Sequence, residues 1–324
     1  HNISRLEWSA HSDSLYVGLL DEGQVLVLDA AGQQVSSHGW HAYRESRSDV
    51  RALAVNEEGN ELVSAGQDGS IEVWEILDTG ELSLSGILDS SIMREFEVDG
   101  FGTMIAIAQG SGSLDIHDLK TGRRMRSCQH PDWGDDTASI PYIKSVKWLT
   151  EDTVVGGFTD GTVIWCTIMN LGDSHVDFSS IVEMDVFGRL AFKNSKIMAL
   201  SSVPDGTDST IDGEVNILKN TGDIWEVERT WQCPETCWVM EFSSNGERLV
   251  TAEQDGQIRL WNTEADSPVD WFELPTPYSH GNYTGVVEWS PERNAIISVG
   301  WDGEAILYDT DSEQELWRVS LPYE

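Results

Sequence analysis

A two-residue turn ending in glycine recurs seven times along the chain, and its spacing restricts the fold more than any other feature. Successive glycines of this turn are 46, 43, 49, 52, 43 and 47 residues apart, and the segment that runs from the last one through both termini to the first holds 44 residues. Internal repeats of about 40–45 residues are typical of the four-stranded blades of a β-propeller. The seven glycines are Gly23, Gly69, Gly112, Gly161, Gly213, Gly256 and Gly303.

The stretches around each turn alternate apolar and polar residues, as half-buried β-strands do. Examples after the turn are residues 71–74 (IEVW) and 258–261 (IRLW), and an example at the start of a repeat is 146–148 (VKW). No segment has the pattern of a long helix. We therefore predict an all-β fold, a single seven-bladed β-propeller of four-stranded antiparallel blades over residues 1–324. The blades are expected at about 1–38, 48–89, 92–129, 142–178, 180–232, 236–274 and 283–324.

The residue pairs that end the third predicted strands resemble, in degenerate form, the Trp-Asp signature of the WD-repeat family. Trp74-Glu75 and Trp261-Asn262 are two of these pairs. The resemblance implies that a Trp, a hydroxyl, an Asp and a His form a structural hydrogen-bond network within a blade. A catalytic reading of such a set is disfavoured, because a nucleophilic Ser needs exposure and an oxyanion hole. The candidate members are His41, Ser64, Asp68 and Trp74 in the second blade, and His280, Ser298, Asp302 and Tyr308 in the seventh.

The last residues of the chain predict how the ring closes. Residues 315–321 (ELWRVSL) follow the third predicted strand of blade 7 and can form its fourth strand. We therefore expect the two termini to lie side by side, with blades 7 and 1 meeting without an exchanged strand.

The charge and cysteine content limit the classes of partner. The formal net charge is −36, with only 20 Lys and Arg among 324 residues, so direct contact with nucleic acid is not expected. No apolar run is long enough to cross a bilayer, and no membrane partner is expected. The four cysteines have no zinc-type spacing and are predicted to be free thiols. A reducing compartment, the cytoplasm or the nucleus, would follow.

Basic and aromatic residues predict where a partner would bind. A base occupies the same position early in the first strands of blades 2, 3 and 4, and the loops before blades 2 and 7 are rich in aromatic residues. Trp, Tyr and Arg dominate the energetics of many interfaces, and Arg binds carboxylates and phosphates in a bidentate manner. We predict a protein or peptide partner, acidic or phosphorylated, within a multi-subunit assembly; the alternative is that these bases only pair with neighbouring acids. The predicted partner-binding residues are Trp40, Tyr43, Arg44, Arg47, Arg51, Arg94, Lys144, Trp238, Tyr278 and Trp301.

A metal site and a channel enzyme are two further interpretations that the sequence favours less than a binding scaffold. Acidic loops at 205–212 and around His130, Asp132, Asp135 and Asp136 contain oxygen ligands, but neither has the spacing of a calcium-binding loop, so no metal and no cofactor are expected. A metal-dependent hydrolase acting at the central channel is the alternative function. It would need acids or histidines that converge from several first strands, and no catalytic residue is predicted. Those strands are expected to begin at Ile3, Val50, Met93, Ile143, Ile181, Cys237 and Thr284.

Overall fold

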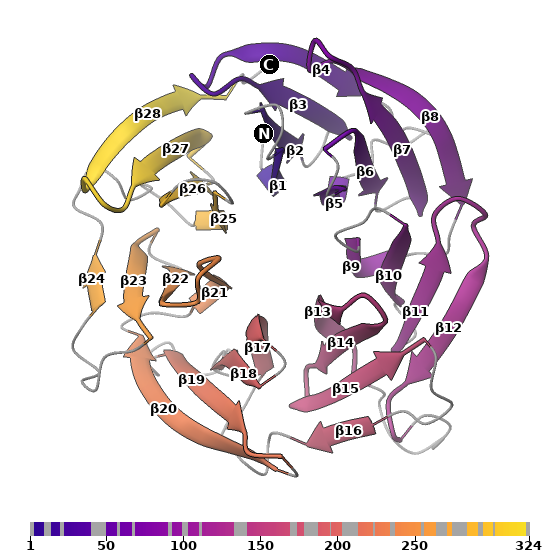
Figure 1. The fold of residues 1–324 in the computed structure, drawn as a ribbon, viewed down its shortest axis with the longest axis vertical. Coiled ribbons are helices and arrows are strands. Elements are labelled where there is room, and N and C mark those ends of the chain that lie inside the picture. Colours follow the sequence, from indigo (N-terminus) through magenta and orange to yellow (C-terminus); the bar gives the residue numbers. More distant parts are fainter. Residues whose placement is uncertain are drawn as a thin grey trace.

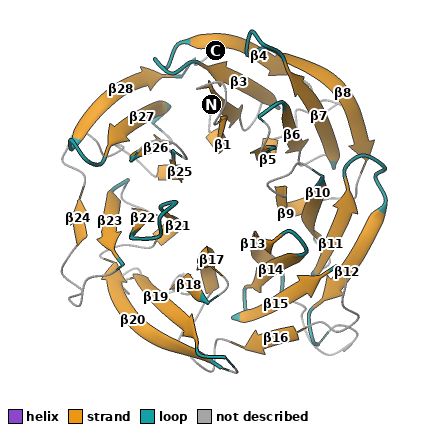
Figure 2. Ribbon diagram, in the orientation of Figure 1, coloured by secondary structure: helices purple, strands orange, loops and turns teal. Residues whose placement is uncertain are grey.

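The structure is a computed structural model in which every described element is a β-strand, as Figure 2 shows. No helix that could span a membrane occurs in the described part of the chain. The described residues are 3–9, 14–19, 23–39, 50–56, 59–66, 69–89, 93–98, 103–109, 112–132, 141–168, 174–177, 187–194, 196–202, 213–222, 224–233, 237–253, 256–263, 271–273, 284–290, 294–300 and 302–321.

The strands form seven separate four-stranded antiparallel sheets, and in each sheet the strands follow chain order from the inside of the ring to the outside. The first strands are β1 (Ile3–Ser9), β5 (Val50–Val55), β9 (Met93–Val98), β13 (Ile143–Thr150), β17 (Phe187–Asn194), β21 (Cys237–Phe242) and β25 (Thr284–Trp289). The second strands are β2 (Ser14–Leu19), β6 (Glu61–Gly66), β10 (Met104–Gln109), β14 (Thr153–Phe158), β18 (Ile197–Ser202), β22 (Arg248–Glu253) and β26 (Ala295–Gly300). The third strands are β3 (Gln24–Leu28), β7 (Ser70–Ile76), β11 (Ser113–Asp118), β15 (Thr162–Thr167), β19 (Gly213–Asn220), β23 (Ile258–Asn262) and β27 (Glu304–Asp309). The outer strands are β4 (Gln34–Gly39), β8 (Leu82–Asp89), β12 (Arg124–Gln129), β16 (Ser174–Asp177), β20 (Trp225–Cys233), β24 (Trp271–Glu273) and β28 (Gln314–Ser320).

The seven sheets are arranged as blades around a central channel, with the first strand of each blade facing the axis (Figure 1). The predicted fold class is therefore confirmed. Six of the seven expected starts of the first strands coincide with the observed ones. The prediction for blade 5 was wrong: its first strand begins at Phe187 rather than Ile181. The alternation of apolar and polar residues near 181–185 (IVEMD), in the longest repeat of the chain, is the sequence pattern that led to the earlier expected start.

The blades are held to one another by apolar side chains, and one buried cluster lies at each of the seven junctions between neighbouring blades. Alternation along a strand sends side chains to opposite faces of the sheet, so each blade contributes to two clusters. On β2, Leu15 and Val17 pack toward blade 7, whereas Tyr16 packs toward blade 2. On β14, Val154 packs toward blade 3 and Val155 toward blade 5.

The ring closes between blades 7 and 1 by packing and side-chain hydrogen bonding. β1 is the innermost strand of blade 1 and β28 the outermost strand of blade 7, and no strand is exchanged, as the sequence predicted. The Trp317 indole Nε1 donates to the Ala30 carbonyl at 3.0 Å. A Cβ at Gly32 would lie 2.5 Å from Cγ2 of Val319 and 3.1 Å from the Trp317 ring. Gly32 thus lets the outer strand of the last blade lie against the β3–β4 turn of the first.

The glycines that marked the repeat serve a conformational purpose. Gly23, Gly69, Gly112, Gly161, Gly256 and Gly303 all have positive φ, between 62° and 91°. Only glycine adopts this region without steric cost. The turn between the second and third strands therefore requires glycine, which explains why this residue persists where the Trp-Asp pair has diverged.

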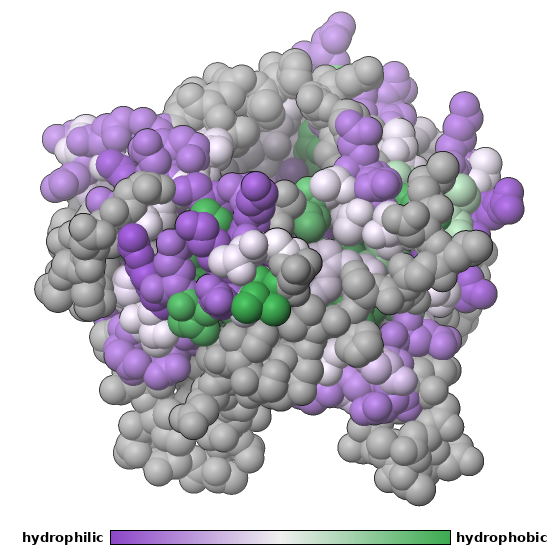
Figure 3. All heavy atoms as spheres, turned by 60° about the horizontal axis from the view of Figure 1, so that its bottom comes forward, coloured by the Kyte–Doolittle hydropathy of each residue, from purple (hydrophilic) through white to green (hydrophobic). Residues whose placement is uncertain are grey.

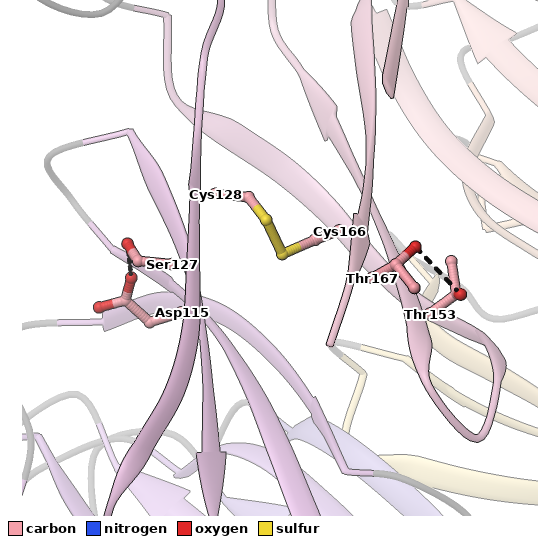
Figure 4. The surroundings of a disulfide bond; sticks show 6 residues. All are labelled: Asp115, Ser127, Cys128, Thr153, Cys166 and Thr167. Carbon is pink, nitrogen blue, oxygen red and sulfur yellow. Dashed lines mark hydrogen bonds between the residues drawn. A yellow bond between two sulfur atoms is a disulfide. The ribbon is translucent and has the colours of Figure 1, made fainter. Parts of the chain in front are cut away.

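Two of the four cysteines are joined, so the prediction of four free thiols was wrong. Cys128 on β12 of blade 3 and Cys166 on β15 of blade 4 form a disulfide, with Cα atoms 5.8 Å apart (Figure 4). Their separation of 38 residues is close to one repeat, and the ring brings such positions together across a blade junction. Cys233 and Cys237 are free and buried.

The disulfide occupies a position at which other junctions place aromatic side chains. Cys128 and Trp231 have the same register on their outer strands, as do Cys166 and Trp261 on their third strands. Trp231 and Trp261 stack across the junction of blades 5 and 6, with ring centroids 5.0 Å apart and planes at 12°. The covalent bond thus replaces a stacking contact at an equivalent point of the repeat.

We expect Gly32→Ala to destabilise the protein by about 2–4 kcal/mol. Two costs combine in this variant: the new methyl group clashes with Val319 and Trp317, and a residue with a side chain is strained at φ +74°. Thermal unfolding followed by circular dichroism measures the effect. Gly80→Ala is the matched control, since Gly80 has a φ of +80° but a Cβ there would meet only the Ser14 hydroxyl oxygen, at 3.6 Å, an ordinary van der Waals contact. A loss of about 1 kcal/mol is expected for the control. Equal losses in the two variants would show that the closing contact contributes nothing.

We expect Cys128→Ser with Cys166→Ser to lower the free energy of unfolding by about 4 kcal/mol, because the bond closes a loop of 38 residues in the unfolded chain. Unfolding by urea with and without a reductant measures this. The wild-type chain should lose the same stability on reduction, and the double variant should be insensitive to the reductant. A count of four reactive thiols in the denatured, unreduced protein would contradict the assignment.

Candidate functional site

The first strand of every blade carries an irregularity in its pairing at the same place, immediately after its first residue. In six blades one residue is skipped in the pairing with the second strand, and in blade 5 two residues are skipped. β-bulges of this kind bend a strand and re-aim a side chain. We call this set the bulge ring. It consists of Ser4, Arg51, Arg94, Lys144, Gly188 with Arg189, Trp238 and Gly285.

The bulge ring surrounds one mouth of the channel. In an antiparallel blade the start of the first strand and the turn between the second and third strands lie at the same end, so the bulges and the glycine turns share one rim. The sevenfold repetition of the fold thereby places serine, arginine, lysine, glycine and tryptophan at equivalent positions around the axis. A ligand that covers this mouth would meet several of them at once.

Positive charge is concentrated on one side of the bulge ring. The bulge residues of blades 2, 3 and 4 are Arg51, Arg94 and Lys144, in three consecutive blades. Arg189 of blade 5 extends this arc, and its Nη1 donates to the Lys144 carbonyl at 2.5 Å. Arg51, Lys144 and Arg189 are half-buried. Because the chain as a whole has a formal charge of −36, this arc is a local exception.

The structure describes four of the ten predicted partner-binding residues, and all four are bulge residues. Arg51 and Lys144 are described with their side chains, and Arg94 and Trp238 by their place on β9 and β21. Trp238 belongs to blade 6, across the channel from the basic blades (Figure 1). The remaining six lie outside the described residues: Trp40, Tyr43, Arg44, Arg47, Tyr278 and Trp301.

Arg189 is the residue of the basic arc that sequence reasoning missed. Its blade was expected to begin six residues earlier, so the base fell in the middle of the expected strand rather than near its start. The pair Gly188-Arg189 after an apolar residue was the available signal, since Arg51, Arg94 and Lys144 also follow an apolar residue.

The channel behind this mouth contains a cavity of about 270 Å³ lined by the first strands. Contrary to the expectation from the strand starts, three carboxylates from neighbouring blades line it: Glu7, Glu241 and Glu288 of blades 1, 6 and 7. Three bases line the same cavity, Arg5, Lys147 and Arg189. The acids are mid-strand residues, which is why the residues at the strand starts gave no sign of them.

Two of the channel carboxylates bind the backbone of the next blade. Glu241 Oε2 accepts from the Trp289 backbone N–H at 2.8 Å, and Glu7 Oε1 accepts from the Val55 N–H at 3.3 Å. Both are therefore occupied in joining neighbouring first strands. In the described part of the chain, the channel acids do not form a group close enough to share a metal ion.

The structural hydrogen-bond network implied by the family resemblance is present in parts. Trp74 Nε1 donates to Ser64 Oγ at 2.9 Å, and Trp261 Nε1 donates to Thr251 Oγ1 at 2.8 Å, in buried surroundings. Asp302 accepts from the Glu304 backbone N–H. His41, Asp68 and His280 lie outside the described residues.

His130, next to the acidic loop before blade 4, contributes to this structural network, and Asp135 and Asp136 of that loop lie outside the described residues. His130 is buried, and its Nε2 lies 3.0 Å from Asp160 Oδ2 and 3.1 Å from Thr162 Oγ1. Its Nδ1 accepts from the Asp132 backbone N–H, so Nε2 carries the proton and donates. The histidine thereby joins the end of blade 3 to the glycine turn of blade 4.

Comparison with known proteins finds two segments, residues 33–75 and 225–262, that match the family "WD domain, G-beta repeat". Each runs from the outer strand of one blade to the third strand of the next, and these are the repeats that keep a Trp bonded to a hydroxyl. The chain is 31% identical over 117 residues to human Striatin-4, which is 36% of this chain and 14% of that protein. It is 26% identical over 121 residues to a probable cytosolic Fe-S cluster assembly factor of Schizosaccharomyces pombe, which is 32% of this chain and 20% of that protein.

The chain thus spans a fifth or less of the length of these two relatives in the matched region. Among solved structures, the β-propeller domain of Cps50 (Swd1) from Myceliophthora thermophila superposes with a TM-score of 0.72 over 93% of both chains, at 14% identity. That similarity concerns the fold. The chain is therefore a seven-bladed β-propeller that carries WD repeats at residues 33–75 and 225–262.

Proposed function

We propose that this propeller is a non-catalytic scaffold that binds a protein or peptide partner at the rim carrying the bulge ring. The partner is an acidic or phosphorylated segment, and the propeller acts as a subunit or domain of a larger assembly. WD-repeat propellers commonly serve as interaction scaffolds, and a fold of this kind acquires its specificity from residues placed on it. The single observation that carries the proposal is the bulge ring, with bases in blades 2 to 5 and a tryptophan in blade 6, the next blade of the ring.

The charge distribution supports an anionic ligand. A chain with a net charge of −36 repels acidic partners at long range, so binding of an acidic segment requires a local cluster of bases. Arg51, Lys144 and Arg189, of blades 2, 4 and 5, supply bases on one side of the mouth. The half-buried position of these side chains favours strong charge-assisted hydrogen bonds. Figure 3 shows that the described residues on one face of the molecule are mainly hydrophilic, with small separate apolar patches, which also favours polar recognition.

Catalysis at the channel is the less favoured function. The observation in its favour is the set of three channel carboxylates. Two of them accept backbone N–H groups of the next blade, which leaves little capacity for binding a metal or transferring a proton. We therefore propose that the channel is a structural element.

A cytoplasmic or nuclear location is proposed from the name of the fission yeast relative, a probable cytosolic assembly factor. The Cys128–Cys166 disulfide argues against a reducing compartment, because such bonds persist mainly in oxidising ones. Rapid alkylation of thiols in intact cells, followed by mass spectrometry, decides between them. Labelled Cys128 and Cys166 are expected in the cytoplasm or nucleus. An unlabelled, disulfide-bonded pair would place the protein in an oxidising compartment.

We expect Arg51→Glu with Arg94→Glu to weaken the binding of an acidic partner at least tenfold, because two charge-assisted contacts become repulsive. The probes are two fluorescent peptides, a poly-glutamate and a poly-phosphoserine peptide, titrated with the full chain by fluorescence polarisation. Affinity capture from cell extract with both proteins then identifies natural partners whose recovery depends on the two bases.

Arg123→Glu with Lys196→Glu is the matched control. It makes the same change in net charge, but both residues are exposed in turns at the opposite rim, between third and outer strands and between first and second strands. Binding should be nearly unchanged in this variant at physiological salt, where distant charges are screened. Equal weakening by the two double variants would show that binding depends only on the net charge of the chain. Unchanged binding by the Arg51→Glu, Arg94→Glu variant would contradict the proposed site.

A further inference from the structure

Three potential metal ligands meet in the buried junction between blades 5 and 6. They are Cys233 at the end of β20, Cys237 at the start of β21 and Glu253 at the end of β22. Each of the three residues is 0% exposed. One ligand atom from each, two Sγ and one carboxylate oxygen, lies within 4.8 Å of the other two. Sequence spacing alone identified only the two cysteines, because Glu253 arrives through the pairing of β21 with β22.

Equivalent positions in the other blades show that this combination is not required by the fold. Cys233 has the register of His130, and Cys237 and Glu253 have the registers of Ile143 and Phe158. At the junction of blades 3 and 4 these positions hold a histidine that packs against Phe158, with ring centroids 4.9 Å apart. Across the described blades, the place of Glu253 is taken by uncharged residues: Leu19, Gly66, Gln109, Phe158, Ser202 and Gly300.

We propose that Cys233, Cys237 and Glu253 form a binding site for a zinc-type divalent cation, which joins blade 5 to blade 6. Two thiolates and a carboxylate are a donor set that suits zinc, whereas calcium and magnesium prefer oxygen ligands alone. Ligand atoms around tetrahedral zinc are about 3.5–3.8 Å apart, given zinc–sulfur bonds of about 2.3 Å. Since the three atoms lie within 4.8 Å of one another, they need to approach by about 1.3 Å at most to reach this geometry.

The charge balance of the site permits a divalent ion. Glu253 forms an ion pair with Arg259, whose side chain is also buried, so the site with two neutral thiols has no net charge. Binding of M²⁺ releases two thiol protons to solvent, and the two thiolates and the metal then cancel. The buried charge is the same before and after binding, so the metal does not leave an uncompensated charge in the interior.

A side-chain hydrogen bond joins Thr251 to the Cys237 thiol. Thr251 Oγ1 also accepts from Trp261 Nε1 at 2.8 Å. Its hydroxyl proton is thereby directed to the Cys237 sulfur, in the manner of the outer hydrogen bonds that orient metal ligands.

The test measures zinc in the full chain after reduction, removal of metal with a chelator, and dialysis against zinc chloride. About one zinc ion per chain is expected for the wild type, and a loss of that equivalent for Cys233→Ser with Cys237→Ser. Cys128→Ser with Cys166→Ser is the matched control and should keep its zinc. Glu253→Gln should weaken zinc binding at least tenfold, as measured by competition with a chromogenic chelator, because a neutral amide replaces an anionic ligand.

Cobalt(II) added to the wild-type chain provides a measurement that needs no variant. Thiolate-to-cobalt charge-transfer absorption is expected at one cobalt ion per chain, and zinc should displace it. Absence of this absorption in the reduced protein, or zinc retained in full by the Cys233→Ser, Cys237→Ser variant, would overturn the proposal. A Cys233–Cys237 disulfide that reforms in preference to metal binding, seen as loss of two thiols, would overturn it as well.

Discussion

The packing of apolar side chains between neighbouring blades is the interaction on which the whole structure depends. Each blade is a separate sheet whose strand pairing stays within the blade, so the backbone ladder does not join one blade to the next. Seven buried clusters, one at each junction, supply the cohesion. Residues on a strand must therefore alternate between two junctions, as Leu15 and Tyr16 do. Removal of apolar surface from water is the dominant favourable term at such junctions.

The junctions also show where this chain departs from a uniform repeat. One outer-strand position faces one third-strand position across each junction, and these pairs differ in kind: His38 with Trp74, Cys128 with Cys166, Trp231 with Trp261. Next to the last of these pairs lie Cys233, Cys237 and Glu253. They place polar ligands where the junction of blades 3 and 4 has a histidine and apolar residues. A repeat fold tolerates such exchanges because each junction contacts only its two blades.

The bulge ring shows how the same repetition can produce a binding surface. An irregularity in the pairing after the first residue of each first strand places equivalent residues of the seven blades at one mouth of the channel, whatever those residues are. The bases Arg51, Arg94 and Lys144 of blades 2 to 4 then lie on one side of this mouth, in a chain whose formal net charge is −36. The scaffold determines the positions, and the residues at those positions determine the ligand.

The spacing of the glycine turns was sufficient to predict the number of blades, because a positive φ at six of the seven turns leaves little choice of residue. Residues 315–321 predicted the closure without an exchanged strand, and the sequence pattern predicted six of the seven first-strand starts. The shared position of Arg51, Arg94, Lys144 and Trp238 was also visible in the sequence. The start of blade 5, and with it the place of Arg189, was not visible in the sequence, since the alternation near 181–185 favoured an earlier start. The Cys128–Cys166 bond, the channel carboxylates and the contact of Glu253 with two cysteines depend on register between strands and on which blades are neighbours. Those relations join residues far apart in the chain, so only the tertiary structure decides them.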